Sequence, residues 1–361
     1  MWTKTYGSTG KHISAIGFGG MRFAKPEDID LSAELLLHAH KKGINYFDTA
    51  PYYCDDRSEG IFGHAFKQMP RESFYVSTKC SEASGDKLRA SLERSLTRLN
   101  VSKINFFHIW CLLRDGQLEE RTQGGAIGAA LKAKEEGLIE HLVVSSHLDG
   151  DGIAKVLDSR LFEGITIGYN AINFPFRAKA LESALRHKVG VVTMNPLGGG
   201  LIPRNAERLA FLKGPQDRDV VQAALRFNIS QPAITAALVG FSTIDEIDQA
   251  VEAVENFTPY TADHIEGLKA HLSTSFDGFC TGCGYCVPCP AQIEIPKLMD
   301  VYNQKILVGT DEAMLDRLKW HWSMSPDVAA ACLQCGECEN ACTQHLPIVK
   351  RLEAIAGLRQ G

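Results

Sequence analysis

The sequence has no large excess of either charge and no long apolar segment. Its 38 Lys and Arg residues against 43 Asp and Glu residues give a formal net charge of −5. Proteins that bind nucleic acid usually carry a strongly basic face, so this balance argues against a nucleic-acid partner. The longest uncharged stretch, residues 227–244, contains Asn228, Gln231 and Pro232, which predict a helix end, a loop and a strand. We therefore expect no membrane span.

The first twelve residues, MWTKTYGSTGKH, lack the apolar core of a secretion signal. Cysteine is scarce before residue 280, where only three of the 11 cysteines lie, and the other eight fall between residues 280 and 342. A secreted disulfide scaffold would spread its bridges through a small fold. Clustered thiols without an export signal instead predict a metal centre and a cytoplasmic protein. The same contrast predicts a body of residues 1–275 and a cysteine-rich tail of residues 276–361.

Short apolar runs alternate with helix-like segments along the body. Leu88, Leu92, Leu96 and Leu99 recur at helical spacing and predict one buried stripe. The expected strands are residues 15–18, 45–48, 74–78, 104–110, 141–145, 164–169, 190–194 and 236–239. Eight strands that alternate with helices predict an α/β fold, a (β/α)8 TIM barrel. A doubly wound sheet is the alternative, but it usually begins with a Gly-rich turn that residues 17–22 do not match.

Residues 6–14 precede the first expected strand and contain the turn-forming sequence Ser8-Thr9-Gly10. Two short strands around this turn would form a hairpin. We expect the hairpin to cover the amino-terminal end of the barrel.

Three side chains at the ends of neighbouring strands suggest acid catalysis. Asp48 ends the second expected strand, Lys79 follows the third, and Tyr53 lies five residues after Asp48. A phenol with a pKa near about 10 is a weak acid at pH 7. A neighbouring ammonium would lower that pKa, and a carboxylate would hold the ammonium in place. Tyr53 could then protonate a carbonyl oxygen while a hydride reaches the carbon.

The body resembles the aldo-keto reductase family in the segments GINYFDTAPYY, VSTK, SSH, YN, NPLGGG and LVGFS. The resemblance implies a reductase of a small-molecule carbonyl compound that uses a nicotinamide cofactor, NADP or NAD. It assigns the catalytic roles to Asp48, Tyr53 and Lys79. It also implies that the cofactor lies across the barrel mouth. The residues that would hold it are Ser145 and Asn170 at the carboxamide, Met194 in place of a stacking aromatic residue, Leu197, Gly198 and Gly199 at the pyrophosphate, and Ser242 at the adenosine phosphate.

Two positions depart from the family pattern. Trp110 stands where the family has a histidine, and we expect it to line the substrate pocket. His108 shares its face of the strand one layer deeper, so it is either a displaced catalytic residue or a core histidine. Residues 243–249 contain no Arg, although a 2′-phosphate usually pairs with Arg or Lys, so both NADP and NAD stay open.

The tail contains two runs of four cysteines. They read Cys280-x2-Cys283-x2-Cys286-x2-Cys289 and Cys332-x2-Cys335-x2-Cys338-x3-Cys342. Three cysteines at such intervals can wrap three corners of an iron–sulfur cubane, whereas structural zinc usually takes separated pairs. The tail resembles bacterial-type ferredoxin domains, which implies a helical domain with two [4Fe-4S] clusters. The resemblance implies one ligand set of Cys280, Cys283, Cys286 and Cys342, and another of Cys332, Cys335, Cys338 and Cys289.

These features leave three interpretations of function open. The first is a carbonyl reductase whose clusters relay electrons or stabilise structure. The second is an electron-transfer enzyme whose barrel binds another redox cofactor, such as a flavin, for which no motif is visible. The third is a module that docks a redox partner protein. A hydride carries two electrons and a [4Fe-4S] cluster carries one, so direct coupling would need a flavin or a radical intermediate.

Overall fold

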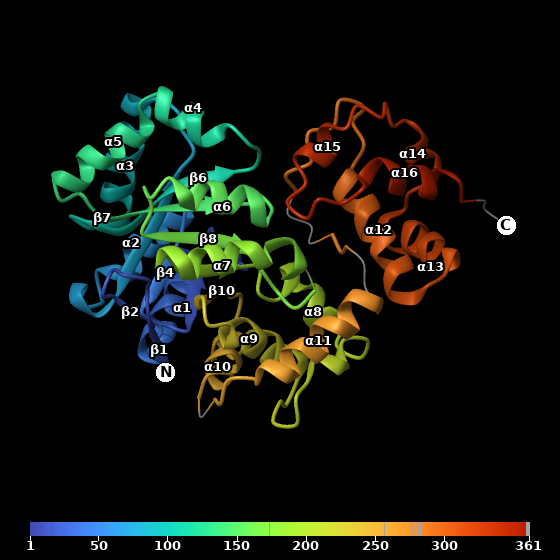
Figure 1. The fold of residues 1–361 in the computed structure, drawn as a ribbon, viewed down its shortest axis with the longest axis horizontal. Coiled ribbons are helices and arrows are strands. Elements are labelled where there is room, and N and C mark those ends of the chain that lie inside the picture. The colour runs from blue at the N-terminus through green and yellow to red at the C-terminus, as the bar shows by residue number, and fades with distance from the viewer. Residues whose placement is uncertain (173, 256, 276–277, 281–283, 359–361) are drawn as a thin grey trace.

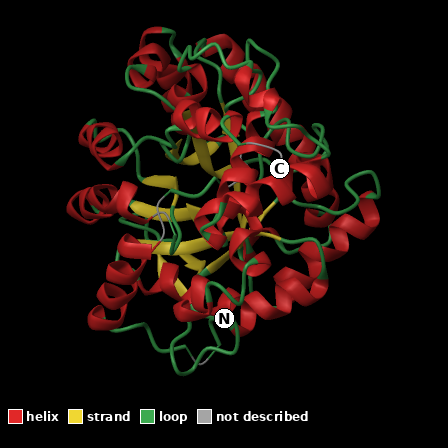
Figure 2. Cartoon of the chain, turned by 90° about the vertical axis from the view of Figure 1, so that its right-hand side faces the viewer, coloured by secondary structure: helices red, strands yellow, loops and turns green. Residues whose placement is uncertain are grey.

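The computed structural model describes residues 1–172, 174–255, 257–275, 278–280 and 284–358. Eight parallel strands close into a barrel in the order β10-β3-β4-β5-β6-β7-β8-β9. Figure 2 shows these strands enclosed by helices. The strands are β3 (Ile16–Gly19), β4 (Tyr46–Asp48), β5 (Tyr75–Cys80), β6 (Ile104–Leu112), β7 (Ile139–Ser146), β8 (Gly164–Gly168), β9 (Gly190–Met194) and β10 (Ile234–Gly240). The TIM-barrel prediction is confirmed, with strand ends displaced by a few residues.

Most of the longer helices around the barrel bury an apolar face, as α3 (Gly85–Leu99) shows. In the helix of residues 85–99, Leu88, Leu92 and Leu99 are buried, as the sequence pattern predicts, and Leu96 is half-buried. The helices are α1 (Ile29–Lys41), α2 (Ser58–Phe66), α3 (Gly85–Leu99), α4 (Gln117–Gln123), α5 (Ala126–Glu135), α6 (Gly150–Asp158), α7 (Ala178–His187), α8 (Leu201–Arg204), α9 (Val220–Ser230), α10 (Ile244–Glu252) and α11 (Ala262–Ser275). Short 3-10 turns connect some of them: η1 (Arg71–Ser73), η2 (Phe174–Arg177), η3 (Gly198–Gly200) and η4 (Ala210–Leu212).

The amino-terminal hairpin closes the bottom of the barrel. Strands β1 (Thr3–Thr5) and β2 (His12–Ser14) pair antiparallel, which confirms the expected hairpin. Tyr6, just after β1, is fully buried against Gly164 and Gly190, the first residues of β8 and β9. A Cβ at Gly164 would come within 2.4 Å of the Tyr6 ring, so this close approach requires glycine. The open mouth of the barrel is therefore its carboxyl-terminal end.

The tail is a second, smaller helical body beside the barrel, drawn in orange and red in Figure 1. Its elements are α12 (Ile295–Val308), α13 (Asp311–Asp316), the π-helical turn η5 (Arg317–Trp322), α14 (Asp327–Ala330), α15 (Glu337–Asn340) and α16 (Ile348–Ala356). Leu298, Val301 and Leu318 are buried in its own apolar core. Met314 is also buried there, whereas the neighbouring Leu315 is half-buried.

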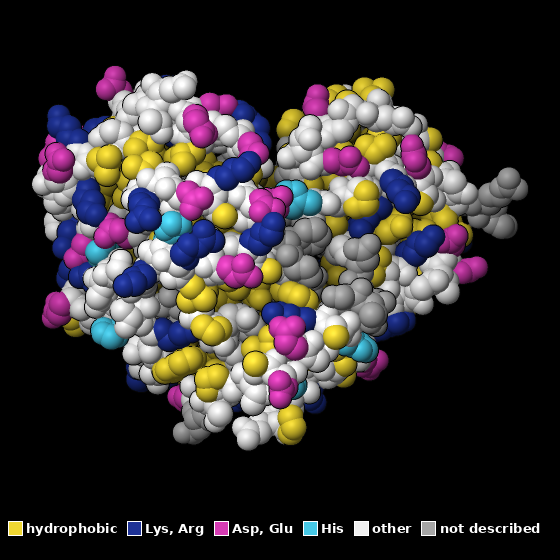
Figure 3. All heavy atoms as spheres, viewed as in Figure 1, with side chains coloured by type: hydrophobic (Ala, Val, Ile, Leu, Met, Phe, Trp, Pro, Cys, Tyr) yellow, Lys and Arg dark blue, Asp and Glu magenta, His cyan; other side chains and the backbone are white. Residues whose placement is uncertain are grey.

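Among the described residues, no helix is both long and apolar enough to span a membrane. On the face shown in Figure 3, basic and acidic side chains lie interspersed. Neither sign of charge dominates this face (Figure 3).

Candidate active site and cysteine-rich segment

Asp48 and Lys79 form a buried ion pair at the mouth of the barrel. Asp48 ends β4 and Lys79 is the penultimate residue of β5, so adjacent strands bring both side chains to one edge. Lys79 Nζ donates to Asp48 Oδ1 and, at 2.7 Å, to the carbonyl oxygen of Thr49. Burial lowers the pKa of Lys79, and the Asp48 carboxylate opposes that shift. The pair keeps a cation beside the mouth in a site with little water.

Tyr53 lies in the loop after β4, between Lys79 and Trp110. Its ring centroid is 5.7 Å from that of Trp110 and 5.4 Å from Lys79 Nζ. From the sequence we expect Lys79 to lower the pKa of Tyr53, but this expectation is wrong for the structure. Burial first, and then the Asp48 charge, raise the pKa of Tyr53 above its usual value. A phenol is protonated at pH 7 even at its usual pKa of about 10, so Tyr53 holds a proton that it can donate.

The loop that carries Tyr53 has an unusual backbone. Four of its residues other than glycine have left-handed φ angles: Tyr52 (72°), Cys54 (53°), Asp55 (54°) and Asp56 (65°). Such angles cost free energy and persist only where neighbouring contacts impose them. Asp56 accepts hydrogen bonds of 2.6 and 2.7 Å from Arg98, and Ser58 donates to the Gly20 carbonyl oxygen at 2.8 Å. These contacts fix the loop against α3 and the end of β3.

His108 lies inside the barrel, opposite Lys79 in the β5–β6 register. It is fully buried, and its Nε2 lies 3.0 Å from Ser77 Oγ. Ser77 donates to Asp48 Oδ2 at 2.6 Å, so its oxygen is left to accept a hydrogen from His108 Nε2. Burial, followed by the Lys79 charge, lowers the pKa of His108 well below its usual value. These are the contacts of a neutral core histidine that orders Asp48 through Ser77.

Ser77 is a site residue that the sequence did not lead us to predict. It lies two residues before Lys79 in β5, and alternate residues of a strand point to the same face. That alternation in VSTK was the available signal. Its hydroxyl carries the contact between His108 and Asp48.

Trp110 borders a cavity beside the ion pair. The cavity has a volume of about 220 Å³ and lies between the loop after β4, the end of β5 and α3. Lys79 and Tyr52 also line it, together with Lys87 and Arg94 from α3. Trp110 thus occupies a place where it could contact a small molecule, as we expect for a substrate-pocket residue.

Most residues expected to hold a nucleotide lie along the opposite side of the mouth. Ser145 is the penultimate residue of β7, Asn170 follows β8 by two residues, and Met194 ends β9. Asn170 Nδ2 donates to the Asn195 carbonyl oxygen at 3.0 Å, and its Oδ1 accepts from Ile172 N at the same distance. These bonds hold the amide in one orientation at the edge where a carboxamide would sit.

The loop after β9 contains three consecutive glycines, at the place where the family resemblance puts a pyrophosphate. Leu197 is followed by Gly198, Gly199 and Gly200 with φ angles of 62°, 67° and 89°, which side-chain-bearing residues rarely adopt. The loop can therefore approach a ligand closely. Together with Ser145 and Asn170, it forms the edge of the mouth where the family resemblance places the nicotinamide cofactor.

Ser242 lies at the start of α10, beside an acidic side chain. Its backbone N–H donates to Glu246 Oε2 at 2.6 Å, and its hydroxyl donates to the Arg22 carbonyl oxygen at 2.9 Å. Thr243 and Glu246 form a reciprocal cap on the helix. The Glu246 carboxylate thus lies where we expect, from the sequence, an adenosine phosphate.

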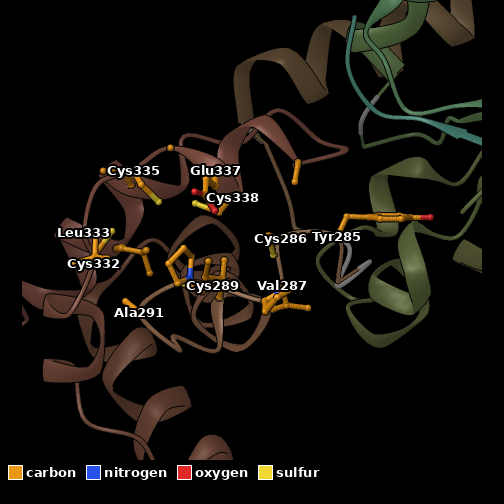
Figure 4. A pocket seen from close by; sticks show the side chains of 17 residues that line it. Tyr285, Cys286, Val287, Cys289, Ala291, Cys332, Leu333, Cys335, Glu337 and Cys338 are labelled. Atoms are coloured by element: carbon orange, nitrogen blue, oxygen red, sulfur yellow. The ribbon is translucent and has the colours of Figure 1, made fainter. Parts of the chain in front are cut away.

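In the tail, five cysteines line one cavity of about 160 Å³, seen in Figure 4. They are Cys286, Cys289, Cys332, Cys335 and Cys338. The cavity therefore places Cys289, from the first run, beside three cysteines of the second run. Cys286, which the ferredoxin resemblance assigns to the other ligand set, also lines this cavity, so the cavity alone does not separate the two sets.

A second, smaller cavity in the tail is lined by Cys280, Cys286 and Cys342. Cys342 comes from the second run, so this cavity also mixes the two runs. Cys283, the fourth expected member of this set, lies outside the described residues. The donor chemistry fits iron–sulfur clusters, because thiolates are their usual ligands. Within the described part of the chain, no three His, Cys, Asp or Glu side chains are grouped closely enough for a single metal ion.

Comparisons with known proteins agree with both parts of the fold. Residues 15–273 match the model of the aldo/keto reductase family, and residues 279–347 match a 4Fe-4S dicluster domain. L-galactose dehydrogenase of Arabidopsis thaliana is 27% identical over 282 residues, which cover 70% of this chain and 87% of that protein.

Two further relatives resemble the barrel. The NADH-specific methylglyoxal reductase of Escherichia coli is 26% identical over 234 residues, covering 59% of this chain and 68% of that protein. The solved structure of aldo-keto reductase AKR11C1 from Bacillus halodurans, in its holo form, superposes with a TM-score of 0.65 at 24% identity. It covers 75% of this chain and 96% of that one. This last likeness supports the barrel fold.

Proposed function

The chain belongs to the aldo/keto reductase family of oxidoreductases and carries a 4Fe-4S dicluster domain, and we propose that it reduces a small-molecule aldehyde or ketone with a nicotinamide cofactor. The observation that carries this proposal is the buried Asp48–Lys79 pair with a protonated Tyr53 beside it. An acid that stays protonated at pH 7 suits reduction of a carbonyl group, because the product oxygen must gain a proton.

A bound reduced nicotinamide supplies the hydride for this reaction. Tyr53 donates its hydroxyl proton to the carbonyl oxygen as the new C–H bond forms, so the carbonyl becomes an alcohol and Tyr53 a phenolate. Lys79 then faces two anions, the phenolate and Asp48, and its charge stabilises the phenolate until solvent returns the proton. Before the reaction the pKa of Tyr53 is raised. In this proposal Lys79 therefore acts by stabilising the phenolate that forms when the proton leaves.

Ser77 and His108 act behind the reacting groups in this proposal. His108 bonds Ser77, and Ser77 donates to Asp48 Oδ2. This keeps Asp48 Oδ1 bonded to Lys79. Trp110 takes the position nearest the substrate, where its indole N–H can donate a hydrogen bond but cannot take up a proton. His108 is therefore a positioning residue, and proton transfer belongs to Tyr53.

NAD is the nucleotide that this mouth favours. Ser145 and Asn170 would hold the carboxamide, Met194 would lie against the nicotinamide, and residues 197–199 would line the pyrophosphate. At Ser242, the carboxylate of Glu246 would repel a 2′-phosphate but could accept a ribose hydroxyl. The relative from Escherichia coli is named as an NADH-specific enzyme, which agrees with this preference.

The tail, taken as residues 276–361, would hold two [4Fe-4S] clusters. One uses Cys280, Cys283, Cys286 and Cys342, and the other uses Cys289, Cys332, Cys335 and Cys338. The two cavities support this assignment because each contains cysteines from both runs. Such clusters supply single electrons and are damaged by oxygen, so we expect the protein to work in a reducing cytoplasm.

A second candidate function is electron transfer between the tail and another redox cofactor in the barrel, or a docked redox protein. The observation that favours it is the contact between Tyr285 of the tail and His147 at the barrel mouth. Flavin analysis of the purified protein separates this function from the first.

Anaerobic purification, followed by iron, sulfide, zinc and flavin analysis and a carbonyl panel with NADH and NADPH, tests both candidates. We expect about eight iron and eight sulfide per chain, since each cluster holds four of each. Tyr53→Phe should lower kcat/KM for a responsive substrate by at least about 10²-fold. Tyr75→Phe is the matched control, because Tyr75 is the first residue of β5 and lies at the end of the barrel away from the mouth. Full activity of Tyr53→Phe would reject the reductase mechanism, and stoichiometric zinc without sulfide would reject the clusters.

A further inference from the structure

Arg177 joins the barrel to the tail at the mouth. It is the last residue of η2 and is completely buried, with an exposed fraction of 0%. Its Nη2 donates to the His147 carbonyl oxygen at 3.1 Å and to the Thr343 carbonyl oxygen at 2.5 Å. His147 directly follows β7, and Thr343 directly follows Cys342. One guanidinium nitrogen therefore holds a strand end of the barrel and the residue beside a cluster cysteine.

A ring contact lies next to this hydrogen-bonded bridge. The Tyr285 ring is 4.9 Å from the His147 ring, with the planes inclined at 58°. Figure 4 shows the Tyr285 side chain pointing away from the cysteine cavity, toward the green ribbon of the barrel. Tyr285 directly precedes Cys286. Cys286 and Cys342, both in the first ligand set, are thus each one residue from a contact with the barrel.

The second ligand set has different surroundings. Cys335 is exposed, and Leu333, between Cys332 and Cys335, is 67% exposed. The two sets therefore define an inner cluster site against the barrel and an outer site near solvent. Among the described residues, the hydrogen bond to Thr343 places the buried Arg177 cation beside the inner site.

We propose that Arg177 is a positioning residue that fixes the inner cluster against the barrel mouth and, through its charge, makes that cluster easier to reduce. The inference rests on the proposed clusters but not on carbonyl reduction. A cluster becomes more negative when it gains an electron, so a nearby cation stabilises its reduced state. Arg keeps its charge at any working pH, and burial limits the screening of that charge by salt.

The test compares the full-length, cluster-loaded protein with its Arg177→Met variant. Reduction of the two clusters is followed by EPR in a redox titration. We expect one cluster to become at least about tenfold harder to reduce, which is about 59 mV for one electron, while the other stays unchanged. Hydrogen exchange should also become faster at residues 145–148 and 342–346, because the bridge between them is lost.

Two further variants separate charge from packing. Arg177→Lys keeps the charge but not the planar fork, so we expect faster exchange at the same segments with both potentials retained. Arg226→Met is the matched control, since Arg226 is another buried arginine of the barrel and pairs with Asp217 at 2.7 Å. It should leave both potentials and the exchange of residues 342–346 unchanged.

Unchanged potentials in a folded Arg177→Met variant would overturn the proposal, as would an equal shift of both clusters. If Arg177→Met does not fold, a lowered potential in Arg177→Lys would overturn it equally, because the charge is still present. Wild-type protein with no iron or sulfide would instead reject the proposed clusters. Wild-type protein without carbonyl reductase activity would leave the role of Arg177 standing.

Discussion

In the barrel, the candidate reacting groups are held by other side chains of the same chain, whereas in the tail the cysteines surround cavities. Asp48 is bound by both Lys79 and Ser77, and these contacts need no ligand. The cysteines of the tail lie around cavities of about 160 Å³ and about 10 Å³, next to a small apolar core. A barrel of eight strands can therefore organise acid–base chemistry beforehand, while the short helices of the tail depend on what the cysteines bind.

The strongest test of this contrast is removal of the metal. We expect the iron-free chain to lose the fold of its tail while the barrel stays folded, because ligand binding and folding are coupled in small metal domains. Limited proteolysis with mass spectrometry should find cleavage confined to residues after 278. Cys332→Ala should reproduce part of this effect, whereas Cys80→Ala, at a buried cysteine of the barrel, should not. A tail that resists proteolysis in the iron-free protein would contradict the claim that its fold depends on the clusters.

The next largest effect concerns the ion pair of the barrel. Lys79→Met should destabilise the folded barrel by about 3–5 kcal/mol, because it leaves the Asp48 charge buried and unpaired. It should also lower carbonyl reduction by at least about 10²-fold. The measurements are denaturant unfolding and kcat/KM. The double variant Asp48→Leu with Lys79→Met should recover much of the stability but none of the activity. Equal stability of the single and double variants would contradict the pairing.

A smaller effect is expected at His108. His108→Leu should cost about 1–3 kcal/mol of unfolding free energy, because Ser77 loses its donor. His108→Gln can donate to Ser77 and should retain most of the stability. Activity per folded molecule should stay close to wild type in His108→Gln. A loss of turnover in a fully stable His108→Gln protein would restore the displaced-catalyst hypothesis.

His108 also predicts a pH dependence. Its pKa in the folded protein lies well below the value of about 6.5 in an unfolded chain. Below about pH 6.5 the unfolded chain binds a proton that the folded chain does not, so the stability falls as the pH falls. His108→Gln should remove that part of the slope in unfolding experiments between about pH 7 and pH 5. An unchanged slope would show that His108 takes up its proton in the folded state.

The smallest effect is expected at the nucleotide end of the mouth. Glu246→Gln keeps the cap on α10 but removes the negative charge of residue 246. The ratio of kcat/KM with NADPH to kcat/KM with NADH should therefore rise a few-fold. Glu252→Gln, at the other end of the same helix, is the control. A preference for NADPH in the wild-type protein would contradict the proposed choice of NAD.

The sequence predicts the barrel well because its signals are local. Alternating apolar runs, the stripe of Leu88, Leu92 and Leu99, and the Ser-Thr-Gly turn each report a period or a turn that neighbouring residues define. The same locality places Asp48 and Lys79 at strand ends. The grouping of these strand ends then follows from the topology of a parallel barrel.

Properties that depend on contacts across the fold were harder to predict. The pKa of Tyr53 is raised by its burial and then by the Asp48 charge, and both depend on contacts that a sequence does not contain. The contact of His108 with Ser77 depends on the register between β5 and β6. No sequence pattern indicated a role for Arg177, because its hydrogen-bond partners are backbone oxygens 30 and 166 residues away.

The amino-terminal hairpin determines from which end of the barrel a ligand can bind. With Tyr6 packed against the first residues of β8 and β9, the barrel is closed at its amino-terminal end and filled by side chains, so a ligand can approach only its carboxyl-terminal mouth. The tail contacts one side of this mouth, where Arg177 bonds both His147 of the barrel and Thr343 of the tail. In the proposed reductase, the nucleotide, substrate and product would therefore share the part of the mouth that the tail leaves uncovered. Because these molecules would share one opening, they would bind and leave in a fixed order, even without any difference in affinity.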